Sequence, residues 1–437
     1  MSSFSFRLLL PALLLWLAST GQAQAIAPIQ QWRMDNGLRV LLMEAHHLPM
    51  VVLRLTVPAG SAMDAPGKEG TASLLAAMLG DHTARHGHRA WADLLDAEAI
   101  RFGVGADRDA LSFSATTLVE ALPETVTLLD EAVRRPGWDG KRFAILRNNA
   151  RSALRKSLEQ PRVRAAIASL KLLYGDHPYG HRISGTPESL GGITMADLQR
   201  LYTAQVKPQG AVLAVSGDVT MAQLKRLLAP LAGWHGAPRR MPADLPRPQP
   251  RPAASRHIAM PTHQTTVQLV RLGPDRHDRD IFPTLLMNEI LGGGGFASQL
   301  MREVREKRGL VYGVYSYFEP LARPGPFVIT LQTRNDQTRE ALTVVEQVMA
   351  SMAAGKITAQ ALRAAKEHLI GGFAHRIDAN AKRVALMSMI GFYDLPLDYL
   401  TRWRARIGAV TLAQVRQMAA RYLPRKGWST ITVGGGP

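Results

Sequence analysis

The stretch LGGGGFASQLMREVREKRGLVYGVYSYF, residues 291–318, predicts a helix, a stop and a strand in immediate succession. The part SQLMREVREK has the pattern of a helix, and Gly309 follows as a C-terminal stop. The part LVYGVYSYF then alternates as a β-strand does. We therefore expect Arg305 near the helix end and Tyr312 early in the strand, close together at one rim.

The same order of elements occurs in both halves of the chain. In the first half, the strand patterns LRVLLM and MVVLRLTV precede a helix that contains an apolar face of Leu74, Leu75, Met78 and Leu79. In the second half, the strand pattern TTVQLVRLG precedes the helix pattern FPTLLMNEIL. In each half a later strand runs through a polar turn into an amphipathic helix. Long helices are also expected at 142–172 and 357–390.

These patterns predict an α+β fold of two tandem homologous domains. Each domain is expected to be a mostly antiparallel sheet with helices packed on one face, because strands and helices occur in separate runs. The segment GAPRRMPADLPRPQPRPAAS is rich in Pro and Arg, which predicts an extended, semi-rigid linker. We expect domains at 26–235 and 257–437, joined by a linker at 236–256.

Residues 1–25 have the layout of a secretory signal peptide. A short polar start with Arg7 precedes an apolar run that ends at Ala18, and Ala23-Gln24-Ala25 offers a cleavage site. The run is too short to be a membrane anchor, and no later stretch is long and apolar enough to span a bilayer. We expect cleavage after about Ala25 and a mature protein in the periplasm.

The composition excludes some functions and leaves others open. The chain of 437 residues has no cysteine, so structural disulfides and thiolate sites are excluded. Its formal net charge is +18, which favours acidic peptides or a membrane face as much as nucleic acid. No nucleic-acid motif accompanies that charge, and we expect no nucleic-acid partner. A solvated, arginine-rich surface is the simplest interpretation.

Four segments resemble the insulinase/pitrilysin zinc metallopeptidases, in particular the two-domain bacterial relatives of the mitochondrial processing peptidase. They occur in the family's order and together the resemblance covers almost the whole mature chain. The first matches the family's opening strands, the second a region between helices, the third the strand that closes the first domain, and the fourth the hallmark of the second domain. The segments are MDNGLRVLLMEAHHLPMVVLRLTVPAGSAMD, LYGDHPYGHRISGTPESLGGITMADLQRLYTAQVKP, AVSGDV and the stretch 291–318.

Active members of that family carry the motif H-x-x-E-H on the first long helix. Two imidazoles on one helical face bind zinc, the Glu between them acts as general base, and a Glu on a later helix completes the site. The aligned residues here are Ser73, Leu74, Leu75, Ala76 and Ala77. Glu159, close to Pro161, lies too late to align with the further Glu. We expect no family zinc site in this chain, whose helix is kept for its core-facing side.

Other histidines offer no clear replacement for the missing site. His82 and His86 have helical ligand spacing, but we expect the helix to end at Gly87 and see no acid placed to complete a tetrahedral set. They are interpreted as a surface or loop cluster. Turn or strand-end positions are expected for His46 and His47, and His177 lies in the turn sequence GDHPYG.

The family hallmark REKRGLVY is intact and supplies two candidate catalytic residues. In the family an Arg and a Tyr at this spacing hydrogen-bond the substrate near the scissile carbonyl, which implies that role for Arg305 and Tyr312. Without the resemblance, an Arg near a helix C-terminus is explained by the helix dipole and a strand Tyr by core packing. Arg308 is the nearest rival, but its spacing to Tyr312 differs from the motif.

The glycine run 292–295 allows two interpretations. It resembles the start of the glycine-rich loop in the non-catalytic subunit of the mitochondrial processing peptidase, although that loop is longer. The alternative is a tight connection between two helices, where glycine lets other backbone approach closely. A phosphate-binding loop is not expected, because no Gly-Lys-Ser/Thr follows.

The resemblance implies the non-catalytic subunit of a heterodimeric zinc metalloendopeptidase. The partner subunit would carry H-x-x-E-H and the zinc, while this chain, with no cofactor of its own, would contribute peptide-binding and carbonyl-polarising residues. The alternative is a peptide-binding or structural clamshell protein with no role in proteolysis. A neighbouring gene that encodes an H-x-x-E-H chain would distinguish the two.

Overall fold

The computed structural model describes residues 27–435 and contains two separate β-sheets. The expected signal peptide therefore lies outside the described residues. The first sheet has six strands, of which only β2 and β6 are paired in parallel. In spatial order they are β1 (Gln30–Arg33), β2 (Arg39–Glu44), β6 (Val212–Gly217), β3 (Met50–Val57), β5 (Leu111–Leu118) and β4 (Arg101–Ala106).

The second sheet repeats this plan with five strands. Only β7 and β11 are paired in parallel, and β9 and β7 are the two edge strands. In spatial order the strands are β7 (Ser255–Ala259), β11 (Ser429–Gly434), β8 (Gln264–Leu272), β10 (Pro326–Arg334) and β9 (Val311–Phe318). The prediction of two mostly antiparallel sheets is confirmed. The expected linker lies between the last strand of the first sheet and the start of β7.

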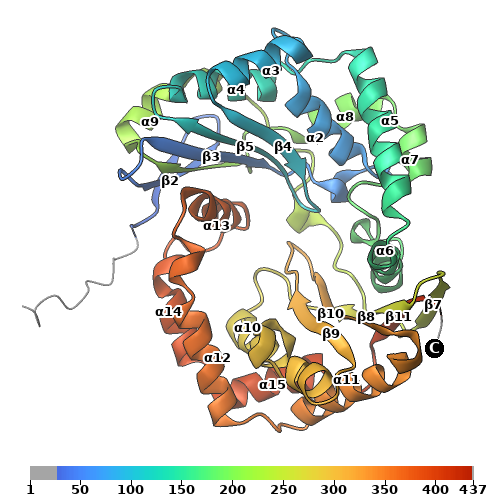
Figure 1. Cartoon of the computed structure of the whole chain (residues 1–437). Coiled ribbons are helices and arrows are strands. Elements are labelled where there is room, and N and C mark those ends of the chain that lie inside the picture. The colour runs from blue at the N-terminus through green and yellow to red at the C-terminus, as the bar shows by residue number, and fades with distance from the viewer. Residues whose placement is uncertain (1–26, 436–437) are drawn as a thin grey trace, which may run out of the picture.

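Helices form a layer on one face of each sheet, as predicted (Figure 1). In the first half these are α2 (Thr71–Asp81), α3 (His88–Ala97), α4 (Leu122–Arg134), α5 (Gly140–Ser157), α7 (Pro187–Gly192), α8 (Met195–Gln205) and α9 (Met221–Leu227). In the second they are α10 (Ile281–Asn288), α11 (Thr338–Ala353), α12 (Ala359–Gly371), α14 (Tyr399–Ala409) and α15 (Leu412–Tyr422). No helix among residues 27–435 is long and apolar enough to cross a membrane.

The two expected long helices are each interrupted, so that prediction is wrong in detail. The first breaks into α5 and α6 (Pro161–Tyr174), because a proline is favourable only in the first turn of a new helix. The second breaks into α12 and α13 (Asn380–Phe392), with an irregular stretch between them. These breaks free α6 and α13 to leave the helical layer of their own half.

Each half gives one helix to the sheet of the other half (Figure 1). Helix α13 packs on the first sheet, where a Cβ added to Gly391 would lie 2.6 Å from a methyl group of Val212. Helix α6 packs on the second sheet, where the hydroxyl of Ser169 donates a hydrogen bond of 2.8 Å to the side-chain oxygen of Gln268. This exchange makes the two halves one interlocked body.

The exchange explains why the central strands are apolar on both faces. In β2, Val40 and Leu42 face the helices of the first half, whereas Leu41 and Met43 belong to the core of the second half. All four side chains are buried. A continuous apolar run such as LRVLLM is typical of a strand that is covered on both sides.

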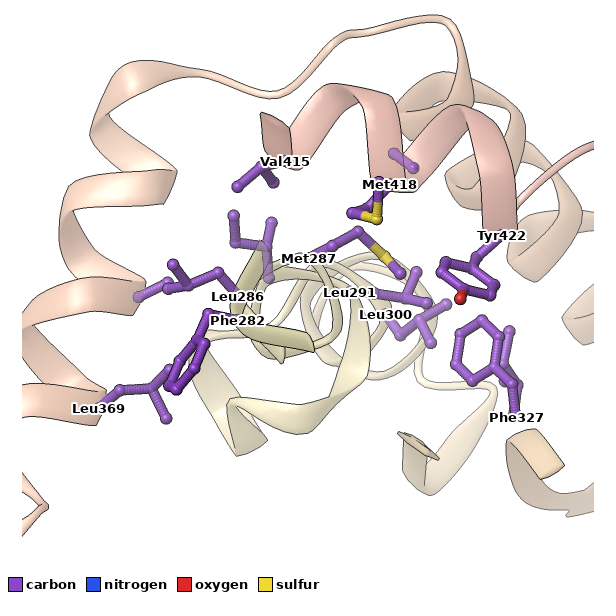
Figure 2. Close-up of a cluster of buried hydrophobic side chains, with 14 of the residues drawn as sticks. Phe282, Leu286, Met287, Leu291, Leu300, Phe327, Leu369, Val415, Met418 and Tyr422 are labelled. Atoms are coloured by element: carbon purple, nitrogen blue, oxygen red, sulfur yellow. The ribbon is translucent and has the colours of Figure 1, made fainter. Parts of the chain in front are cut away.

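The core of the second half is built around α10 and α15. Figure 2 shows Leu286 and Met287 of α10 beside Val415 and Met418 of α15, all of them buried. At one end of this core Tyr422 lies against Phe327, with ring centres 6.3 Å apart. The glycine run and β9 pack against this core.

Asp109 joins the two halves at the turn between β4 and β5. Its fully buried carboxylate accepts hydrogen bonds from the hydroxyls of Tyr179, at 2.5 Å, and Tyr393, at 3.0 Å. It also accepts a bond of 2.8 Å from the backbone N–H of Ala322, in the turn between β9 and β10. Edge hairpins of both sheets are thus tied to one side chain.

Candidate functional site

Helix α2 carries the positions that bind zinc in active insulinase-like chains. The side chains of Leu74, Leu75 and Ala76 are buried in the core of the first half, while Ser73 and Ala77 are partly exposed. The apolar face predicted for this helix, which also contains Met78 and Leu79, is confirmed as core. This face of the helix is therefore held in place by packing.

The residues on and near α2 do not fit a zinc ion. Zinc in proteins is bound by thiolate, imidazole or carboxylate groups, and the aligned serine and alanines offer none of these. Glu159 lies beyond the end of α5 and is exposed. Across residues 27–435, no group of three or more His, Cys, Asp or Glu side chains gathers as a metal site requires. The residues of α2 therefore do not support metal-dependent chemistry at this helix.

His82 and His86 lie differently from the sequence prediction. Helix α2 ends at Asp81, six residues before the predicted stop at Gly87, and Gly87 instead precedes α3. The Nδ1 atom of His82 is 3.0 Å from the carboxylate of Asp81. The Nδ1 atom of His86 is 3.0 Å from the carboxylate of Glu131, so each histidine is paired with a different acid.

Asp81 and Glu131 are the acids that the sequence pattern did not reveal. Burial opposes ionisation of Asp81, but the guanidinium of Arg142, at 2.6 Å, holds the pKa of this carboxyl below its ordinary value. Glu131 is buried and also accepts from Arg85 at 2.9 Å. Both acids come from helices, and together with the histidines they bind the 82–88 loop to the first half. This loop is a structural element.

His46 and His177, two further histidines that the sequence singled out, have structural partners. His46 follows β2 and lies 2.6 Å from Asp218 and 3.0 Å from Glu44, and these hydrogen bonds raise the pKa of its imidazole. His177 sits in the predicted turn, where Nδ1 accepts from the backbone N–H of Tyr179 and Nε2 lies 2.8 Å from the carbonyl oxygen of Pro246. Burial lowers the pKa of His177.

Arg305 and Tyr312 lie together, as the sequence predicted. Arg305 is in a π-helical turn (Met301–Glu306), and Gly309 has a φ of +63°, which ends the helix in the left-handed conformation. The chain then enters β9. The guanidinium carbon of Arg305 is 5.0 Å from the centre of the Tyr312 ring, whose side chain is 86% exposed. The hydroxyl of Tyr312 therefore faces solvent.

The guanidinium of Arg308, the rival candidate, is already bound to Glu303. Its Nη1 donates a hydrogen bond of 2.7 Å to the carbonyl oxygen of Glu303 and lies 3.2 Å from the Glu303 carboxylate. The guanidinium of Arg305, in contrast, makes no hydrogen bond or ion pair with any residue between 27 and 435. Its donors are free for an external acceptor such as a carbonyl oxygen.

Phe296 is a third member of this site, and the sequence patterns did not single it out. The guanidinium carbon of Arg305 is 4.8 Å from the centre of its ring, which is 66% exposed. Two exposed aromatic rings therefore contact one guanidinium, and such contacts fix the cation by cation–π attraction. The available signal was a large apolar residue directly after a glycine run.

The glycine run is a closely packed connection that places Phe296 against Arg305. A Cβ on Gly292, Gly293 or Gly294 would lie 2.5–2.7 Å from Ser316, Asn288 or Glu289 respectively. Gly295 has a φ of +58°, which other residues rarely adopt. The interpretation as a close-packed connection is supported, and the run is not an open loop.

Exposed aromatic side chains gather around this site. Tyr315 and Tyr317 are exposed on β9, and the ring of Tyr315 lies over Gly313, where a Cβ would be 2.9 Å from it. Together with Phe296 and Tyr312 they make up four of the seven large apolar or aromatic residues that are exposed among residues 27–435. A gathered patch of this kind is typical of a binding surface.

The fold and the site define a metallopeptidase-like chain, and comparisons with known proteins agree on that class. The model of the insulinase family, peptidase family M16, matches residues 39–186. The model described as the peptidase M16 inactive domain matches residues 192–369. The chain belongs to the insulinase family.

Known relatives and solved structures cover nearly the whole chain. A structure described as a peptidase M16 inactive domain from Pseudomonas fluorescens is 33% identical, with a TM-score of 0.88, and the match covers 94% of this chain and 98% of that one. The non-peptidase homolog YmxG of Helicobacter pylori is 24% identical over 90% of both chains. An uncharacterized zinc protease of Mycobacterium tuberculosis is 25% identical over 92% of both chains. The relatives thus carry both peptidase and non-peptidase names.

Proposed function

We propose that this chain is the non-catalytic subunit of a heterodimeric zinc metalloendopeptidase. The observation that carries the proposal is the contrast between its two halves. Helix α2 keeps its packing but has serine and alanine at the family's ligand positions, whereas the Arg305 guanidinium is held by two rings with its donors free. A chain with no catalytic role has no need to hold an unpaired guanidinium at an exposed aromatic site.

The contribution of this chain to the reaction would be electrostatic. When a peptide carbonyl is attacked, negative charge grows on its oxygen, and donors already aimed at that oxygen lower the barrier. Arg305 and Tyr312 are two such donors, and neither has a partner to give up first. The exposed rings of Phe296 and Tyr315 would contact the peptide beside the scissile bond. The zinc and the general base would come from an H-x-x-E-H partner subunit.

The place of action that fits this proposal is the periplasm. The signal-like pattern of residues 1–25 supports an exported chain. The substrate would be a peptide in an extended conformation.

The test is reconstitution. The purified chain is mixed with an H-x-x-E-H family chain encoded next to its gene, and the mixture is assayed by size-exclusion chromatography and by cleavage of unstructured peptides. A one-to-one complex that cleaves, from two chains that do not cleave alone, is the expected result. A stable homodimer that binds peptides and never cleaves would favour the alternative of a peptide-binding or structural clamshell protein.

A further inference from the structure

A separate cavity of about 280 Å³ lies at one end of the second sheet. It is bordered by the end of α6, the Pro-rich segment, the end of β8 and the loop between α15 and β11. Four arginines line it and no acidic residue does: Arg247, Arg251, Arg271 and Arg421. Neither Arg305 nor Tyr312 is among its lining residues, so the cavity is independent of the site described above.

Two of these arginines already have counter-ions. Arg247 pairs with Asp275 at 2.9 Å, and Arg421 pairs with Asp278 at 3.2 Å and with a second aspartate. The other two, Arg251 and Arg271, take part in no ion pair with any residue from 27 to 435. The cavity therefore has two guanidinium groups without an ion-pair partner in the described part of the chain.

Arg271 is the anchored member of this pair. It lies directly opposite Phe327 in the pairing of β8 with β10, and its Nη1 donates a hydrogen bond of 3.0 Å to the carbonyl oxygen of Tyr422. Its guanidinium carbon is 5.6 Å from the centre of the Trp428 ring. Figure 2 shows the rings of Phe327 and Tyr422 side by side, and Phe327 also contacts the ring of Trp428.

This environment makes an unpaired guanidinium unfavourable. The Nε atom of Arg271 is buried and has no hydrogen-bond partner within the described part of the chain. Burial lowers the pKa of Arg271, and no nearby carboxylate offsets the effect. A positive charge that is partly removed from water gains most when an anion arrives, because the interaction is stronger where the dielectric is low.

We propose that this cavity binds a small oxyanion, either a phosphate or a carboxylate. The planar guanidinium offers paired N–H donors that match both groups. Arg271 would hold the anion from the sheet, and Arg251 would approach it from the Pro-rich segment. The anion would then tie that segment to the second domain.

The test is a calorimetric titration of the dialysed full-length chain with inorganic phosphate, at constant ionic strength set by sodium chloride. One phosphate per chain should bind saturably. The variants Arg251→Gln and Arg271→Gln should each weaken binding at least about tenfold, since each removes charge-assisted hydrogen bonds. A parallel titration with acetate shows whether the site prefers a carboxylate.

Arg89→Gln is the matched control, because it removes the same charge from an exposed position of α3 in the first half. It should bind phosphate as the wild type does. Arg251 is exposed, so its variant stays informative even if Arg271→Gln unfolds. The proposal is overturned if neither phosphate nor acetate binds saturably, if both cavity variants bind like the wild type, or if Arg89→Gln weakens binding equally.

Discussion

Tyr393 donates a hydrogen bond of 3.0 Å to the carboxylate of Asp109, which lies 284 residues earlier in the chain. The bond connects the turn directly after α13 in the second half with a hairpin turn of the first. Because Asp109 also accepts from Tyr179 and from the backbone of Ala322, its removal leaves three donors without this acceptor, of which the Tyr179 hydroxyl is buried and the other two are partly buried. Asp109 is therefore a polar contact between the two halves that adds to the packing of the exchanged helices α6 and α13.

Asp109→Ala should lower the free energy of unfolding by about 3 kcal/mol, the cost of stranding buried donors. Tyr393→Phe loses a single bond and should cost about 1 kcal/mol. Urea denaturation followed by circular dichroism measures both. Asp176→Ala removes an exposed aspartate and should leave stability nearly unchanged. Equal behaviour of Asp109→Ala and Asp176→Ala would show that Asp109 does not join the halves.

The pH dependence of stability should contain a contribution from Asp64, at the start of α2. Its carboxylate accepts from the backbone N–H groups of Gly70 and Ala72, each at 2.8 Å, yet burial raises its pKa to about 7. Between about pH 4 and pH 7 the folded chain thus binds this proton more tightly than the unfolded chain does. The contribution of Asp64 to stability therefore falls as pH rises through that window.

Asp64→Asn should remove this loss of stability at higher pH, because asparagine does not titrate. The free energy of unfolding of the variant, minus that of the wild type, should be higher at pH 8 than at pH 5 by on the order of 2 kcal/mol. Urea titrations at the two pH values measure the difference. Asp176→Asn serves as the exposed control and should give nearly equal differences at both. A difference for Asp64→Asn that falls with pH would contradict the raised pKa.

The chain purified alone should hold no stoichiometric zinc, because serine and alanine occupy the ligand positions of α2 and the nearby histidines are paired with separate acids. Elemental analysis after dialysis measures the metal content. One tightly held zinc per chain that is lost in His86→Ala would contradict this account and identify the 82–88 loop as a metal site.

Much of this fold was predictable, because the decisive patterns are local. The alternation in MVVLRLTV predicts strand β3, and the glycine after REKR predicts the end of a helix before strand β9. Neither prediction needs information from the rest of the chain. The exchange of α6 and α13 was not predictable in the same way. It depends on which sheet face is left uncovered, and that is a property of the assembled halves.

The site shows the same division. Arg305 and Tyr312 are seven residues apart and are brought together by one turn, so their spacing predicts their contact. Phe296 reaches Arg305 only because the glycine run packs against Asn288, Glu289 and Ser316. Glu131, which pairs with His86, also comes from tertiary structure, whereas Asp81, which pairs with His82, is its neighbour in the sequence.

Phe296 should act as a positioning residue for Arg305. Phe296→Leu should shift the Nε–H resonance of Arg305 in a spectrum of ¹⁵N-arginine-labelled protein, while Phe296→Tyr, which keeps the ring, should restore it. In the assembled complex Phe296→Leu should lower kcat by roughly two- to fivefold, the value of an exposed cation–π contact. Ile145→Ala, an exposed apolar residue of α5, is the control. An unchanged resonance in Phe296→Leu would show that the ring does not hold the guanidinium.

The most direct test of the account is the kcat of the assembled complex with Tyr312→Phe in this chain. The change removes one donor and keeps the ring against Arg305, so kcat should fall about a hundredfold while complex formation and zinc content stay at wild-type levels. Arg305→Ala should cost at least as much. Tyr315→Phe on the same strand and Arg308→Ala on the same turn are the matched controls and should be mild. If Tyr312→Phe leaves both kcat and KM unchanged, Tyr312 does not polarise the scissile carbonyl and the central claim is wrong.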